Sequence, residues 1–385
     1  MKIGFREHHA LNILNAFDLQ TVPLDVFLRN YFRTHKAVGS KDRKEICEAI
    51  YGMIRWKGLL DYLLRDPPTW RSRYERYQNC TPSDHINDLS IPAYVRASFP
   101  KPFYQLLEQS LGPELAFNFC LSSNEPAPTT VRANTLRITR SELLNKWKGS
   151  FNVFACTHSP NAISFKQKIN FFGLDEFKEG CFEVQDEASQ LISDLVDAKP
   201  GDHVLDFCSG SGGKTLAIAP KMRLEGAASP PKLKGQLYLH DIRPHALIEA
   251  KKRLKRAGIQ NAQLISHDSP QKKLLKCRMD WVLVDAPCSG TGTLRRNPDM
   301  KWKFDDQMVE RLVQEQRAIF QEALAYMKPQ GKIVYATCSV LPQENRAQVD
   351  YFLQNFPVEL VSEPFQTFPQ KGGMDGFFGA VFKRK

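Results

Sequence analysis

Apolar residues recur at helical spacing through the first part of the chain. Three groups each share one face of a predicted helix: Ala10, Ile13, Leu14 and Phe17; Leu24, Phe27, Leu28 and Tyr31; and Ile46, Ile50, Met53 and Ile54. Steps of three and four residues are typical of amphipathic helices, and Ser40 is the expected N-cap of the third. Helical spacing returns from Phe103 to Cys120. The N-terminal third is therefore predicted to be helical.

Polar and helix-breaking residues interrupt the N-terminal helical region and mark its end. Residues 66–88 are rich in Pro, Arg, Asn and Asp, which favours a linker or long loop, and residues 124–128 (Asn-Glu-Pro-Ala-Pro) end the helical pattern. The next segment, to about Glu183, has strand-like stretches at 130–136, 151–155 and 181–184 and a helical stretch at 141–148. We expect a small mixed α+β segment here.

From Gln185 onward, helical and strand-like runs alternate. The predicted order is helix 187–196, strand 202–207, a glycine turn, a helix, strand 236–239, helix 244–257, strands 262–266 and 280–285, helix 305–327 and strand 332–336. Alternation of this kind predicts an α/β fold with a largely parallel sheet covered on both faces. The stretch Leu224–Leu233 is predicted to be a surface loop.

The turn after the first of these strands is rich in glycine. After Asp206 and Phe207 it reads Cys208-Ser209-Gly210-Ser211-Gly212-Gly213-Lys214-Thr215. A phosphate-binding P-loop would need glycine at position 208, and a dinucleotide fingerprint would need glycine at position 215, so both patterns miss by one residue. What remains is a tight turn whose backbone amides can approach a cofactor closely.

Three aspartates lie at or just after the ends of successive strands: Asp206, Asp241 and Asp268. Any one of them alone is more typical of a cap or a turn. Together with the glycine turn they favour a cofactor with a ribose diol and an adenine amino group, because a carboxylate accepts hydrogen bonds from both. S-adenosylmethionine is the best candidate, since it needs no phosphate cradle.

Two cysteines each end an apolar, strand-like run. Cys288 lies in Asp-Ala-Pro-Cys-Ser-Gly (285–290) and Cys338 in Ala-Thr-Cys-Ser (336–339). Ligands bind at the carboxyl ends of strands in open α/β sheets, so a thiolate there can act as a nucleophile. Cysteines elsewhere, such as Cys47, Cys120 and Cys156, are more typical of packing. The pattern favours a cofactor-dependent enzyme whose cysteine attacks a flat ring.

Composition narrows the class of protein. The chain has 385 residues, which suggests two or three domains, and a net charge of +11, which favours a polyanionic partner. Basic clusters at 251–256 and 272–276, and Trp302 between two lysines, fit RNA, although a solvated helix surface or core packing explains each of them as well. The nine irregularly spaced cysteines predict a reduced, cytoplasmic protein without a metal site. With no secretory signal and no long apolar run, we expect no membrane association.

Several motifs together resemble the RNA cytosine-carbon-5 methyltransferases of the Sun/Nop2 type, and most of all their bacterial ribosomal RNA branch with a NusB-like N-terminal extension. The matching stretches are 39–43 (Gly-Ser-Lys-Asp-Arg), 132–136 (Arg-Ala-Asn-Thr-Leu), 185–190 (Gln-Asp-Glu-Ala-Ser-Gln), 206–215, 285–290, 296–299 (Arg-Asn-Pro-Asp), 337–339 and 375–378. One departure stands out. The family usually has Cys-Ala-Ala-Pro-Gly-Gly-Lys in the glycine turn, and here that stretch contains no proline.

The resemblance implies three domains: an all-helical, NusB-like RNA-binding domain with its linker (1–124), a small α+β, RRM-like RNA-binding subdomain (125–184) and a Rossmann-like class I methyltransferase domain (185–385). It implies Cys338 as nucleophile, Cys288 in proton removal or product release, and Asp285 on the cytosine. The implied cofactor residues are Cys208, Ser209, Gly210, Ser211, Gly212, Gly213, Lys214, Asp241, Asp268 and Asp285. Arg132, Asn134 and Lys214 are the implied RNA contacts.

The expected activity is transfer of a methyl group from S-adenosylmethionine to carbon-5 of a cytosine in RNA, most of all small-subunit ribosomal RNA. Two alternatives stay open at this point. The substrate can be transfer RNA, or the chain can be a non-catalytic RNA-binding homologue with a degenerate methyltransferase domain. The oligomeric state is also open, with a monomer as the expectation.

Overall fold

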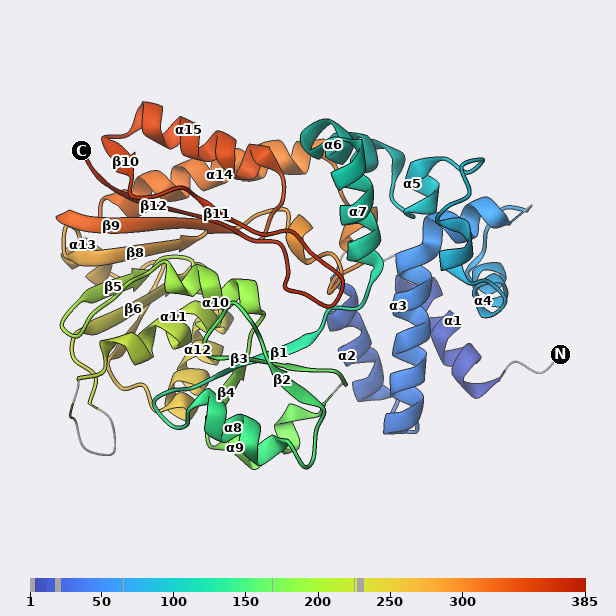
Figure 1. Cartoon of the computed structure of the whole chain (residues 1–385). Coiled ribbons are helices and arrows are strands. Elements are labelled where there is room, and N and C mark those ends of the chain that lie inside the picture. Colours follow the sequence, from blue (N-terminus) through green and yellow to red (C-terminus); the bar gives the residue numbers. More distant parts are fainter. Residues whose placement is uncertain (1–3, 18–21, 65, 168, 225, 227–231) are drawn as a thin grey trace. The chain divides into compact units, whose positions relative to one another are not determined.

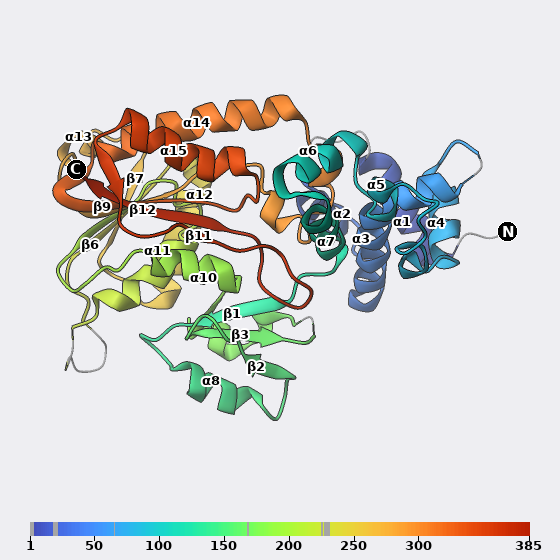
Figure 2. The same ribbon diagram turned by 45° about the horizontal axis from the view of Figure 1, so that its top comes forward.

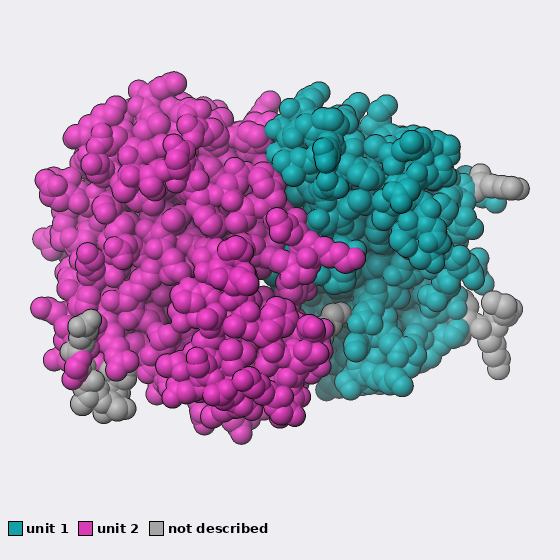
Figure 3. All heavy atoms as spheres, in the orientation of Figure 1, with its two compact units in different colours: residues 1–126, 293–305 teal, residues 127–292, 306–385 magenta. Residues whose placement is uncertain are grey.

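The structure is a computed structural model that describes residues 4–17, 22–64, 66–167, 169–224, 226 and 232–385. The chain divides into two compact units (Figure 3). One comprises residues 1–126 and 293–305, and the other comprises residues 127–292 and 306–385. A short segment from the second half of the chain thus belongs to the helical N-terminal unit. The predicted three-domain division remains a prediction, although its first boundary, after residue 124, lies close to the division between the units.

The first unit is helical, as predicted. Its helices are α1 (Phe5–Phe17), α2 (Leu24–Thr34), α3 (Ser40–Leu63), α4 (Trp70–Gln78), α5 (Ala93–Arg96), α6 (Lys101–Leu111) and α7 (Pro113–Asn124), with 3-10 turns at Pro82–His85 and Met300–Trp302. Residues from the three apolar groups named above, among them Ile13, Leu28 and Ile50, are buried in one core. The predicted N-cap of α3 is wrong by one residue, because Gly39 takes that position and Ser40 begins the helix.

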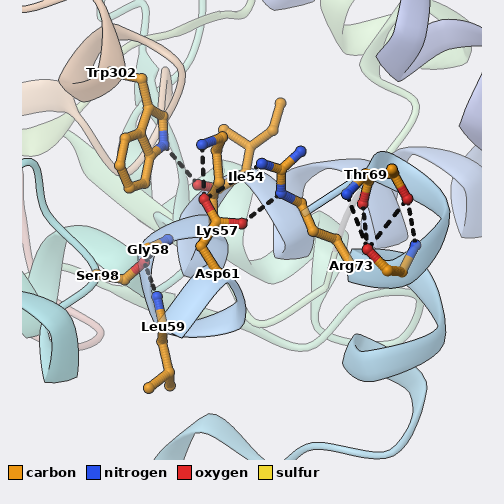
Figure 4. A network of polar contacts seen from close by, with 10 residues as sticks. Ile54, Lys57, Gly58, Leu59, Asp61, Thr69, Arg73, Ser98 and Trp302 are labelled. Atoms are coloured by element: carbon orange, nitrogen blue, oxygen red, sulfur yellow. Dashed lines mark hydrogen bonds and ion pairs between the residues drawn. The ribbon is translucent and has the colours of Figure 1, made fainter. Parts of the chain in front are cut away.

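The prediction of a structureless linker at 66–88 is wrong, because α4 lies inside it. The helix has few apolar positions, and polar contacts define it instead (Figure 4). Thr69 caps it by accepting a hydrogen bond from the Ser72 amide, and Ser72 returns the contact in a capping box. Arg73 forms an ion pair with Asp61 of α3 at 2.6 Å. Apolar periodicity does not indicate a helix of this kind.

The segment 293–305 is anchored in the helical unit by two neighbouring side chains. The indole of Trp302 donates a hydrogen bond to the Ile54 carbonyl at 2.8 Å (Figure 4). Lys301 is 1% exposed and donates to the Arg55 carbonyl at 2.7 Å and to Asn124 Oδ1 at 2.6 Å. Trp302 therefore serves packing rather than base stacking, and Lys301 is not part of a basic surface.

A mixed, mostly parallel sheet forms the centre of the second unit, which confirms the predicted α/β class. Its strands follow the order β10-β12-β9-β8-β5-β6-β7. The parallel strands are β5 (His203–Asp206), β6 (Gln236–Asp241), β7 (Ala262–Ser266), β8 (Met279–Asp285) and β9 (Met327–Thr337). Antiparallel strands β10 (Val358–Leu360), β11 (Phe365–Gln366) and β12 (Phe378–Arg384) complete one edge. This C-terminal edge was not predicted.

Helices cover both faces of the sheet (Figure 1). Phe320 of α14 (Asp306–Leu324) and Phe352 of α15 (Arg346–Asn355) are buried in the core on one face. On the other face the core includes residues of α11 (Gly213–Ile218) and α12 (Pro244–Ala257), with α10 (Glu187–Asp194) packed against α11. A single turn, α13 (Gln271–Leu274), follows β7. The predicted loop 224–233 falls largely outside the described residues.

A smaller antiparallel sheet precedes this core in the chain (Figure 2). Its order is β2-β3-β1-β4, from Val153–Ala155, Ala162–Phe165, Thr129–Ala133 and Phe182–Val184, with α8 (Arg140–Trp147) and α9 (Asp175–Lys178) packed on it. Strand β3 was not predicted. Glu183 of β4 is buried and forms ion pairs with Arg253 and Arg256 of α12, which tie the small sheet to the large one.

Candidate active site

A cavity of about 610 Å³ lies at the carboxyl ends of the parallel strands, where β5 meets β6 and β8. Its walls come from the glycine turn, from the strand ends at Asp206, Asp241 and Asp285, and from α14 through Glu315, Ile319 and Glu322. A cavity of this size suits a nucleoside-sized ligand. Crevices outside the carboxyl ends of strands are the usual ligand sites of open α/β sheets.

Backbone geometry explains the glycines of the turn. Gly212 has φ +78, a left-handed conformation that side chains disfavour, and a Cβ there would lie 3.1 Å from Leu239 Cδ2. Gly210 also has a positive φ, and its amide donates to Asp241 Oδ2 at 2.8 Å. The turn therefore packs closely on β6 and carries Cys208, Ser209 and Ser211 along the cavity wall.

Asp206 is a buried carboxylate, and only one of its two oxygens has a hydrogen-bond partner in the protein. Thr215 Oγ1 donates to its Oδ2 at 2.6 Å, while its Oδ1 is buried without a hydrogen-bond partner. Burial raises the pKa of Asp206 to about 7. Ser209 Oγ and His240 Nε2, which also line the cavity, are buried without partners as well. Unpartnered polar atoms on one cavity wall indicate that a polar ligand satisfies them.

The raised pKa of Asp206 leads to a test of stability against pH. The folded state favours the protonated form, so the stability that this group contributes is fully present near pH 4 and is lost as the pH rises through about 7. Asp206→Asn should remove this dependence. The free energy of unfolding, measured by urea denaturation at pH 5 and pH 8, should therefore fall less in the variant, by on the order of 1 kcal/mol or more. Asp197→Asn, at an exposed site, is the control, and equal pH dependence in both variants would contradict the assignment.

The other two strand-end aspartates differ in their surroundings. Asp241 accepts hydrogen bonds from the Gly210 amide and from the backbone and guanidinium of Arg243. Burial alone would raise the pKa of Asp241. The hydrogen bonds outweigh burial and lower the pKa, so Asp241 faces the cavity as an anion. Asp268 does not line this cavity; it lines a neighbouring hollow, and His267 borders both.

Lys214, which is buried, forms an ion pair with the partly exposed Asp285 at the cavity wall. Burial alone would lower the pKa of Lys214, but the charge and hydrogen bond of Asp285 outweigh it and raise the pKa. The sulfur of Cys338 adds to that effect, which places the lysine within electrostatic reach of the thiol. The ammonium group also lies 5.5 Å from the centre of the Phe377 ring.

The two strand-end cysteines meet. Cys288 Sγ and Cys338 Sγ are 3.3 Å apart, and both side chains are partly exposed. Neither sulfur lines the cavity, but Pro287 and Asp285, directly before Cys288, do. The hydrogen bond to Cys338 raises the pKa of the Cys288 thiol, and burial and the nearby Glu344 raise it further. At this distance one thiol can donate a hydrogen bond to the other, and either sulfur can be the donor.

The residues implied as RNA contacts are buried. Asn134 donates to the Gly180 and Ala257 carbonyls, and its Oδ1 accepts from the Leu136 amide. Arg132 is 5% exposed, and burial lowers its pKa to about 10. Lys214 lies inside the cavity wall. None of the three presents an exposed side chain, and their role in RNA binding remains a prediction.

Several site residues were missed by sequence reasoning. Arg243, Glu315, Ile319 and Glu322 reach the cavity from helices and loops that carry no motif. The basic cluster 251–256 was expected as one surface, yet Arg253 and Arg256 are held by Glu183. These residues carry no sequence signal for the site, and only the fold shows which of them line the cavity.

Within the described ranges, no group of three or more His, Cys, Asp or Glu side chains is placed to hold a metal ion. Across the same part of the chain, every helix is too short or too polar to traverse a bilayer.

The fold and the site define a class: Rossmann-like methyltransferases. The family described as 16S rRNA methyltransferase RsmB/F matches residues 194–383. Ribosomal RNA small subunit methyltransferase B of Vibrio vulnificus is 31% identical over 362 residues, which cover 91% of this chain and 78% of that protein.

Solved structures agree with this class. A methyltransferase homologue from Pyrococcus horikoshii has a TM-score of 0.66 at 26% identity, over 80% of this chain and 100% of that one. NSun6 from the same organism, solved with SFG, has a TM-score of 0.64 at 18% identity, over 75% and 99% of the two chains. The chain belongs to the RsmB/F family of rRNA methyltransferases, as the motifs predicted.

Proposed function

We propose that this protein transfers a methyl group from S-adenosylmethionine to carbon-5 of a cytosine in small-subunit ribosomal RNA, through a covalent adduct with Cys338. The observation that carries the proposal is the pair of sulfurs 3.3 Å apart at the ends of β8 and β9. They lie beside the Lys214–Asp285 ion pair at the wall of a nucleoside-sized cavity. The names of the family and of its curated members support the RNA class.

The cavity residues fit S-adenosylmethionine. The anionic Asp241 suits the ribose hydroxyls, while the free Asp206 Oδ1 and the partnerless Ser209 hydroxyl are further hydrogen-bonding groups on the same wall. NSun6, a structural neighbour, was solved with SFG, an analogue of this cofactor. When bound, the cofactor supplies an electrophilic methyl group on a sulfonium.

Cysteine chemistry is needed because carbon-5 of cytosine is a weak nucleophile. In the proposed reaction, the Cys338 thiolate adds its electron pair to carbon-6 and forms a C–S bond. The ring then becomes enamine-like, and carbon-5 can accept a methyl group. Covalent catalysis of this kind divides one difficult step into easier ones.

The remaining residues complete the cycle. Asp285 is proposed to hydrogen-bond the polar edge of the cytosine, and Lys214 holds Asp285 in place. After methylation the carbon-5 proton passes to a base, the electrons of its C–H bond restore the ring double bond, and the C–S bond breaks with its electron pair returning to Cys338 as the thiolate; Cys288 assists that release. Because a stacked, paired base cannot be attacked in this way, the target cytosine should be unstacked or flipped out.

The direct experiment uses the full chain with methyl-labelled S-adenosylmethionine and two separate substrates, small-subunit ribosomal RNA and transfer RNA. We expect 5-methylcytosine in the ribosomal RNA, located by bisulfite sequencing. Label in transfer RNA alone would move the proposal to that substrate. Absence of product from both RNAs, with cofactor binding intact by calorimetry, would contradict the activity.

A further inference from the structure

The loops that carry the two cysteines are joined by a buried polar network behind the sulfurs. Ser289, next to Cys288, and Ser339, next to Cys338, are both buried, and their hydroxyls lie 3.2 Å apart. Thr291 Oγ1 lies 3.0 Å from the Ser339 hydroxyl and accepts from the Val340 amide at 3.0 Å. The Gly292 amide donates to the Cys338 carbonyl at 2.9 Å. The distance between the sulfurs is therefore fixed by bonds between the loops.

Glu344 is the acidic member of this network. It ends the 3-10 turn Pro342–Glu344, a few residues beyond Cys338, and is 0% exposed. Its Oε1 accepts from the Ser289 amide at 2.8 Å and from Gln316 Nε2 at 3.0 Å, and its Oε2 accepts from the Ser289 hydroxyl. In the described parts of the chain no cationic side chain pairs with it. Its partners are neutral donors, and a negative charge acts more strongly on nearby groups in a low-dielectric interior than in water.

That field acts unequally on the two thiols. Glu344 bonds directly to Ser289, the neighbour of Cys288, and its charge is among the groups that raise the pKa of Cys288 after the Cys338 hydrogen bond and burial. Cys338 is among the groups that interact with Lys214, whose ammonium group is paired with Asp285. The charge of Glu344 thus acts on the Cys288 side of the pair, while Cys338 interacts with the lysine of the Lys214–Asp285 ion pair.

The other titratable groups facing the pair do not alter this order. Asp285 is already paired with Lys214. The Tyr335 hydroxyl lies 2.7 Å from the Glu344 carbonyl oxygen and 3.0 Å from Gln316 Oε1 and can donate to either, and burial raises its pKa, so it remains neutral. The carboxylate of Glu344 is therefore the charge that makes the surroundings of the Cys288 sulfur differ from those of the Cys338 sulfur.

We propose that Glu344 is a positioning residue that holds the shared proton on Cys288 and so leaves Cys338 as the thiolate. The two sulfurs then form an S–H···S⁻ pair with the electron pair on Cys338. When Cys338 bonds to carbon-6, the proton stays on Cys288. The inference rests on the proposed function for the role of Cys338, but the charge asymmetry itself does not require RNA.

The test measures which sulfur reacts, without RNA or cofactor. The full chain is treated with limiting iodoacetamide, which forms an S–C bond with a thiolate and releases iodide, and the modified peptides are quantified by mass spectrometry. In the unaltered protein Cys338 should react faster than Cys288. Glu344→Gln keeps the shape and can still accept from the Ser289 amide, so the ratio of Cys338 to Cys288 modification should fall about tenfold, the equivalent of one pKa unit.

Two controls separate charge from structure. Ser289→Ala removes a hydrogen bond but keeps the carboxylate, so its ratio should stay close to that of the unaltered protein. Melting temperature and cofactor binding show whether Glu344→Gln is folded. If it does not fold, the rates of modification of the two sulfurs in the unaltered protein from pH 6 to 9 decide instead.

Two results would overturn the inference: the same ratio in folded Glu344→Gln as in the unaltered protein, or faster modification of Cys288 than of Cys338 in the unaltered protein. Failure of the proposed function looks different. No RNA would be methylated, while the change in alkylation ratio would still occur.

Discussion

Replacement of Cys338 by alanine should abolish methyl transfer to RNA, with a loss of about 10³-fold or more, because the sulfur proposed to add to carbon-6 is removed. Cys288→Ala should behave differently. Cys338 can still attack, but release of the methylated base is impaired, so a covalent protein–RNA adduct should accumulate. Denaturing gel electrophoresis with labelled RNA reveals the adduct as a slowly migrating band.

The matched control for both variants is Cys277→Ala, since Cys277 is an exposed cysteine of the same unit. It should retain activity and form no stable adduct. Unchanged product from Cys338→Ala would exclude the covalent mechanism. An adduct that persists in the double variant Cys338→Ala/Cys288→Ala would show that another residue is the nucleophile.

Gly292→Ala should lower the free energy of unfolding by about 3 kcal/mol and reduce activity with it. A Cβ at this position would lie 2.0 Å from the Gly376 carbonyl oxygen and 2.9 Å from the Cys338 carbonyl oxygen. Both contacts are backbone atoms, so three segments of chain would have to separate to make room. One of these segments carries Cys338. Urea denaturation followed by circular dichroism measures the loss.

Gly149→Ala is the appropriate comparison, because a Cβ there meets no atom within 4 Å. It should change the stability by only a few tenths of a kcal/mol. Equal stability of Gly292→Ala and the unaltered protein would mean that the close approach of residues 292, 338 and 376 is not a rigid feature of the fold.

The sequence predicts the parallel part of the fold well. Helix α12 and strand β7 have the bounds expected from their patterns, and the helix buries one regular face that includes Leu247 and Leu254. The C-terminal strands were missed for a physical reason. Strand β12 is held in the sheet by pairing with β9, which lies far from it in the sequence. The register of β12 is set by that partner rather than by a local alternation of apolar and polar residues.

The candidate site also contains some residues that the sequence indicates and others that it does not. The glycine turn and the two cysteines carry local signals, since tight backbone geometry and strand-end placement restrict residue types. Glu344 carries none. Its importance comes from donors on Ser289 and Gln316, which approach it only in the folded chain. The same holds for α4, which a capping box and an ion pair define in place of apolar spacing.

Because residues 293–305 belong to the helical unit, that unit cannot complete its packing early in protein synthesis. Chains emerge from the ribosome N-terminus first, and domains commonly fold as soon as they are complete. Here the helical unit lacks the Trp302 and Lys301 contacts until nearly 180 further residues beyond Pro126 have been added (305 − 126). Its final packing must therefore wait until strand β8 and the Cys288 loop that follows it have been translated, so maturation of the two units is linked in time.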